Sequence, residues 1–62
     1  MCESSAFVVS GQSRELLMED VVKVVVRGET VTCTNIVGET KTVSGRLSEV
    51  NLLGHSVTIA AV

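Results

Sequence analysis

The sequence has no proline, tryptophan or tyrosine, and Phe7 is its single aromatic residue. Surfaces that bind single-stranded nucleic acid stack bases on aromatic rings and carry a basic stripe. Here the net charge is −2, and the five basic residues are spread along the chain at Arg14, Lys23, Arg27, Lys41 and Arg46. Binding to RNA or DNA is therefore not expected.

Cysteine and histidine are equally scarce, with Cys2, Cys33 and His55 as the complete set. A zinc finger needs four such ligands, and small disulfide-stapled domains carry more cysteines at regular spacing. The sequence also has no positively charged leader followed by an apolar run, and no apolar run long enough to span a membrane. We expect a cytoplasmic protein with reduced thiols and no membrane association.

Catalytic motifs are absent as well. The five glycines stand singly in turns and form no phosphate-binding loop. A cysteine–histidine pair is conceivable, but a chain this small has little room for a substrate pocket beside a core. We predict that the protein is not an enzyme.

With 62 residues, the chain forms one domain, residues 1–62, near the lower size limit for independent folding. Hydrophobic residues make up 45% of it, mostly valine and leucine. A core of small aliphatic side chains is thin, so association with a second chain is a natural way to bury more apolar surface.

Short apolar segments separated by glycine turns predict an all-β fold, a small antiparallel barrel or sandwich of six or seven strands. The clearest strand is 30–35, where Val31 and Cys33 alternate with threonines. A short helix at Glu15–Val22 is the local alternative. The apolar spacing through Leu47, Val50 and Leu52 departs by one residue from strict alternation, which predicts a bulge or a short bend. The expected core contains Val22, Val24, Val31, Cys33, Val43, Leu47 and Ile59.

The segment from Val21 to Val26 is valine-rich on both faces of the expected strand. Such a strand needs apolar cover on both sides, and left open it would promote aggregation. Barrel closure covers one face, and a second chain is a candidate for the other.

Cys2 stands beside the amino terminus, and this position favours metal binding. A terminal amine, a backbone amide nitrogen and a thiolate can together hold one ion in strain-free five-membered rings, and nitrogen-rich square-planar sites suit nickel or copper. The alternative is that Cys2 is simply the second residue of a frayed terminus. We expect Cys33 to be a buried core residue. His55, in a Gly-His-Ser turn, is expected to be solvated, with metal ligation as a secondary role.

Several segments together resemble one known family. They are the initial Met1-Cys2, the run Glu15–Val21, Val37-Gly38-Glu39, and Gly45–Leu53. This pattern is similar to the CooT family of small nickel-binding accessory proteins of carbon monoxide dehydrogenase maturation. The polar Glu3-Ser4-Ser5 and the uncharged end Ala60-Ala61-Val62 depart from the family pattern.

The resemblance implies an SH3-like β-barrel, a homodimer and Ni(II) bound through Cys2. Two chains would present two Cys2 thiolates with backbone nitrogen at Met1 or Cys2, a four-donor set that suits square-planar nickel. The leading hypothesis is a nickel-binding accessory protein that stores or delivers Ni(II) for a metalloenzyme such as carbon monoxide dehydrogenase. The alternative is a metal-free β-barrel interaction module, with RNA binding a more distant third.

Overall fold

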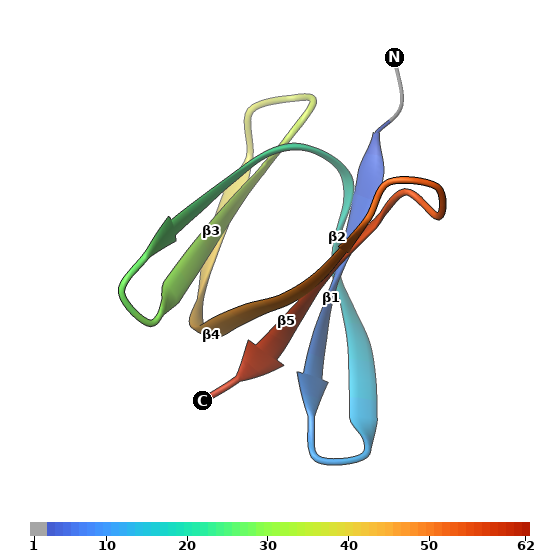
Figure 1. The fold of residues 1–62 in the computed structure, drawn as a ribbon. Helices are drawn as coiled ribbons and strands as arrows, with labels where there is room; N and C mark the ends of the chain where they lie inside the picture. The colour runs from blue at the N-terminus through green and yellow to red at the C-terminus, as the bar shows by residue number, and fades with distance from the viewer. Residues whose placement is uncertain (1–2) are drawn as a thin grey trace.

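A computed structural model describes residues 3–62, and these residues form five β-strands (Figure 1). The strands are β1 (Ser4–Ser10), β2 (Ser13–Arg27), β3 (Thr30–Asn35), β4 (Thr40–Asn51) and β5 (Ser56–Ala61). The all-β, SH3-like barrel is confirmed. The count is five because two long strands, β2 and β4, each replace two of the shorter strands expected from the sequence. The alternative helix at Glu15–Val22 does not form, since that segment lies within β2.

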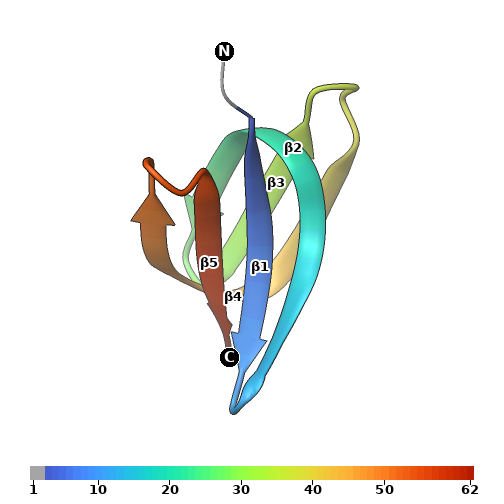
Figure 2. The same cartoon turned by 90° about the vertical axis from the view of Figure 1, so that its right-hand side faces the viewer.

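The strands close into a barrel in the order β1-β2-β3-β4-β5 (Figure 2). Each long strand changes partner partway along its length. β2 pairs with β1 up to Val21 and with β3 from Val21 onward. β4 pairs with β3 up to Ser44 and with β5 from Gly45 onward. The barrel is closed by a parallel ladder between β1 and β5, the one ladder that is not antiparallel among residues 3–62.

Strong bends allow β2 and β4 to serve two neighbours. Asp20 has a φ of 57°, in the left-handed region, immediately before β2 crosses at Val21. At the β4 crossing the backbone lies so close to β5 that a Cβ on Gly45 would be 2.6 Å from the carbonyl oxygen of Ala60. Glycine is therefore the residue that this close approach requires. Beyond it, the β4–β5 register shifts between Leu47 and Glu49, so the irregularity predicted here, a bulge or a short bend, is confirmed.

The barrel interior is small and aliphatic, as the composition predicts. Its buried members are Ala6, Met18, Val21, Val31, Cys33, Val57 and Ile59. The predicted core positions Val31, Cys33 and Ile59 are confirmed as fully buried. Val24 and Val43 are partly buried and pack against this cluster.

Two predicted core residues are wrong. Val22 is 47% exposed and Leu47 is 39% exposed. The β2–β3 register shifts between Val21 and Lys23, which reverses the inward and outward alternation there and buries Val21 in place of Val22. Leu47 lies next to the β4 bulge, past the point where β4 has left β3, so one edge of the strand is uncovered.

Candidate metal centre

The start of β1 is fixed to two different strands. Ser4 is paired with Val21 of β2, and the amide nitrogen of Ser5 donates a 2.9 Å hydrogen bond to the carbonyl oxygen of His55. Residues Ser5–Val9 then run parallel to Ser56–Ala60. The predicted ligand Cys2, and the backbone nitrogen at Met1 or Cys2, lie outside the described residues. The structure does place the site from which that segment departs.

His55 lies at this same end of the barrel. It occupies the turn between β4 and β5, with an exposed side chain and a φ of 52°. The predicted solvated turn position is confirmed. Sequence reasoning gave no sign that His55 would adjoin the start of β1, because a parallel ladder between the first and last strands leaves no local signal.

Cys33 is held away from solvent. It lies in β3 between Val24 of β2 and Lys41 of β4, with a side chain that is fully buried among the core residues. Burial raises the pKa of the Cys33 thiol, because removal from water disfavours the thiolate. The thiolate is the form that binds metals, so this position is poorly suited to ligation.

An apolar groove of about 240 Å³ opens beside Ser4. The residues that line it come from β1, β2, β4, β5 and the β4–β5 turn: Ser4, Val21, Val22, Lys23, Val24, Val50, Leu52 and Val57. Val22, Val50 and Leu52 are substantially exposed. Among residues 3–62, Lys23 is the only charged residue of this lining. The valine-rich face that the sequence predicts to need cover is therefore open in the single chain.

Residues 3–62 contain no group of three or more histidine, cysteine, aspartate or glutamate side chains arranged to hold a metal ion. The described part of one chain thus offers no preassembled protein site. Within the same residues, there is no helix with the length and hydropathy that a membrane crossing requires.

Comparison with known proteins identifies the family. The family described as "CO dehydrogenase accessory protein CooT" matches residues 1–60. The chain belongs to the CooT family. CooT proteins are accessory proteins of CO dehydrogenase, so this chain has an accessory role and is not an enzyme, as the sequence predicts.

One solved structure supports the family assignment, and one further protein is similar in sequence. A crystal structure assigned to CooT from Carboxydothermus hydrogenoformans is 31% identical, with a TM-score of 0.87 and 98% of each chain covered. An uncharacterized protein of Archaeoglobus fulgidus is 45% identical over 42 residues, which span 68% of this chain and 93% of that protein. The CooT fold is thus shared by a solved structure over nearly its full length.

Proposed function

We propose that this CooT protein is a cytoplasmic homodimer that binds one Ni(II) ion between its two Cys2 residues. The ion is cargo, stored or delivered for CO dehydrogenase. The remaining donors are backbone nitrogen at Met1 or Cys2 of each chain. His55, whose carbonyl oxygen accepts a hydrogen bond from the Ser5 amide at the start of β1, is the candidate for a secondary ligand.

The observation that carries this proposal is the full burial of Cys33. The chain has two thiols, and one of them faces the core with its pKa raised. Cys2 is therefore the thiol available for a soft or borderline metal. One thiol and at most two nitrogens from one terminus give three donors, so a four-donor site built from chain termini alone draws on a second chain.

The apolar groove beside Ser4 supports dimerisation at this end of the barrel. Val22, Val50 and Leu52 are exposed there, and burial of such side chains stabilises association. Because Cys2 precedes Ser4 by only two residues, covalent chain length keeps its thiol near the groove. A two-fold axis through this region would bring two Cys2 thiols together.

A nickel titration followed by ultraviolet absorption tests the proposal. Wild-type protein should show thiolate-to-nickel charge-transfer bands that saturate, and Cys2→Ser should abolish them while circular dichroism stays unchanged. Cys33→Ser should retain the bands. Bands that persist in Cys2→Ser would contradict nickel binding through Cys2, and an absence of bands in the wild type would favour the metal-free interaction module.

A further inference from the structure

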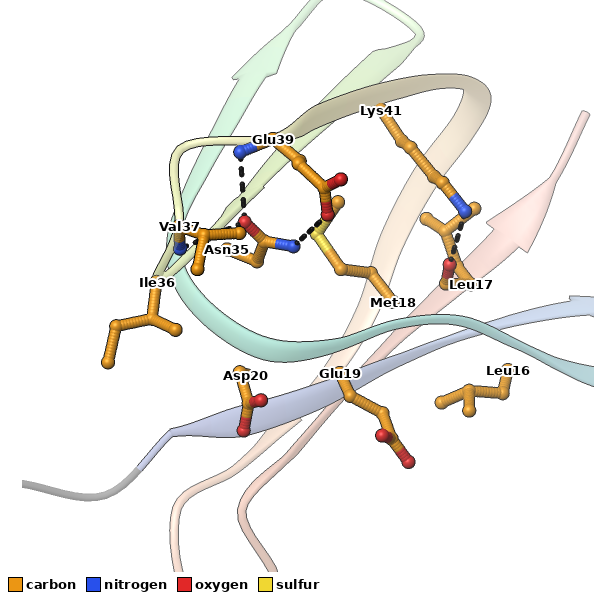
Figure 3. Close-up of a pocket in the computed structure, with 10 residues that line it drawn as sticks. All are labelled: Leu16, Leu17, Met18, Glu19, Asp20, Asn35, Ile36, Val37, Glu39 and Lys41. Carbon is orange, nitrogen blue, oxygen red and sulfur yellow. Dashed lines mark hydrogen bonds between the residues drawn. The ribbon is translucent and has the colours of Figure 1, made fainter.

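A second surface lies along β2 before that strand changes partner at Val21. It shares no residue with the groove beside Ser4. It is an open groove of about 510 Å³ between β2 and the β3–β4 turn (Figure 3). Its lining residues are Leu16, Leu17, Met18, Glu19, Asp20, Asn35, Ile36, Val37, Glu39 and Lys41.

One wall of this groove is a strand edge without a neighbour. Residues 13–20 of β2 pair with β1 on one side, and β3 joins β2 only from Val21 onward. Among residues 3–62, no strand pairs with the other edge of 13–20. Figure 1 shows this half of β2 at the margin of the barrel. Such an edge accepts an extended chain as an added strand.

The opposite wall is a turn that its own hydrogen bonds make rigid. The side-chain oxygen of Asn35 accepts bonds from the amides of Val37 (3.2 Å) and Glu39 (2.9 Å), and its nitrogen donates to the Glu39 carboxylate (2.7 Å). The amide of Ile36 donates to the carbonyl oxygen of Asp20 over 2.9 Å. The turn is thus tied to β2 in one arrangement.

This rigid turn presents apolar side chains to solvent. Val37 is 76% exposed and Ile36 is 53% exposed, while Leu16 is half exposed on the facing strand. In Figure 3, Ile36 and Leu16 lie at the two ends of the groove. A partner that binds here meets a turn whose backbone is already fixed by hydrogen bonds, so less ordering entropy is lost on binding.

The charge of the groove selects the partner. Glu19, Asp20 and Glu39 supply three carboxylates, and Lys41 is the one cation of the lining. The Lys41 ammonium group donates to the carbonyl oxygen of Leu17 over 3.1 Å, a bond that caps part of the strand edge. The groove therefore attracts a basic segment.

A second copy of this chain is a poor occupant. Residues 15–20 of β2 carry three carboxylates and no basic residue, so two such edges would bring acidic side chains together. We propose that this groove binds an extended segment of a partner protein that alternates basic and apolar residues, added as a strand to residues 15–19 of β2. The surface is independent of nickel binding at Cys2.

Amide NMR of the full-length protein tests the proposal, with a short peptide that alternates lysine and valine as the probe. A glutamate–valine peptide of equal length is the control. The lysine–valine peptide should shift the amides of residues 15–20 and 36–37, in wild type and in Cys2→Ser alike, and added salt should weaken its binding.

Matched variants separate charge from apolar contact. Glu19→Lys should weaken binding roughly three- to tenfold, whereas Glu49→Lys, an equal charge change at an exposed site on β4, should not. Ile36→Ser with Val37→Ser should weaken it, whereas Leu53→Ser in the β4–β5 turn should not. Three results with the peptides would overturn the proposal: equal binding of the glutamate–valine peptide, amide shifts confined to other residues, or no shifts at millimolar peptide. Loss of binding in Cys2→Ser would contradict a surface that is independent of the nickel site. Concentration-dependent shifts of the same amides without peptide would show that a second copy of the chain occupies the groove.

Discussion

The amide of Ser5 donates a 2.9 Å hydrogen bond to the carbonyl oxygen of His55, and this bond joins β1 to the turn before β5. This bond begins the parallel β1–β5 ladder that closes the barrel. It sets the start of β1 beside His55 and beside the apolar groove lined by Ser4, Val22 and Leu52. The segment that carries Cys2 therefore departs from a defined place on a closed barrel.

The two thiols should differ sharply in reactivity. In Cys2→Ser, the remaining Cys33 thiol is buried and should react with a thiol reagent only after the barrel opens. In Cys33→Val, the remaining Cys2 thiol should react at least about a hundredfold faster, a difference of roughly 2.8 kcal/mol. Timed labelling followed by mass spectrometry measures both rates. Equal rates would show that Cys33 is not protected by the core.

Stability should fall at alkaline pH because of Cys33. Burial raises the folded-state pKa of this thiol, whereas an unfolded thiol ionises near about 8.5. Above that pH the unfolded chain loses a proton that the folded chain retains, so the free energy of unfolding decreases until the pH reaches the folded-state pKa.

Urea unfolding of reduced protein from about pH 7 to about pH 10 measures this effect. Cys33→Val is the control, since valine is apolar, only about a methyl group larger than cysteine, and has no ionisable group. The difference in free energy of unfolding between wild type and Cys33→Val should be constant below the pKa of the unfolded-state thiol. Above that pKa, the wild type should lose stability relative to the variant. Parallel pH profiles for the two proteins would be inconsistent with a desolvated thiol.

Gly45→Ala should destabilise the barrel by about 1–3 kcal/mol. The new Cβ would lie 2.6 Å from the carbonyl oxygen of Ala60 and 2.9 Å from Cγ2 of the buried Ile59. Gly54→Ala is the matched control, because its nearest neighbour is the exposed Asn51 side chain at 3.1 Å. Thermal or urea unfolding should show a smaller loss for Gly54→Ala. Equal losses would mean that the β4–β5 approach is not as close as described.

Asn35→Ala should destabilise the protein by about 1–3 kcal/mol, because the side chain makes three hydrogen bonds within the β3–β4 turn. Hydrogen exchange at the amides of Val37 and Glu39 should accelerate. Asn51→Ala removes a single bond, from the amide of Gly54, and should cost less. Unchanged exchange at both amides in Asn35→Ala would contradict the rigid turn.

The sequence predicts the fold best where its pattern is local. The alternation in 30–35 correctly places Val31 and Cys33 inside. The change in apolar spacing after Leu47 correctly predicts a bulge or short bend at that point. The sequence pattern places Val22 on the wrong face because the five valines of this segment fit either alternation. The bend at Asp20 and the register shift after Val21 decide which valines point inward.

Contacts between residues far apart in the sequence cannot be predicted from local sequence patterns. Nothing in β1 or β5 indicates a parallel ladder, so the proximity of Ser5 and His55 could not be anticipated. Likewise, the groove between β2 and the β3–β4 turn depends on where β3 joins β2. Cys2 is predicted as a ligand from its position, its residue type and the family resemblance, and its role as a nickel ligand stays a prediction.

Native mass spectrometry of the protein with added Ni(II) tests the central proposal most directly. We predict a dimer that carries one nickel ion, with proton release on binding and weaker affinity as the pH falls, because the thiols and any amide nitrogen ligate in deprotonated form. His55→Ala and Cys33→Ser should largely retain the ion, and Cys2→Ser should lose it. One nickel per chain would contradict the shared site, and nickel retained by Cys2→Ser would contradict the assignment of Cys2 as the ligand.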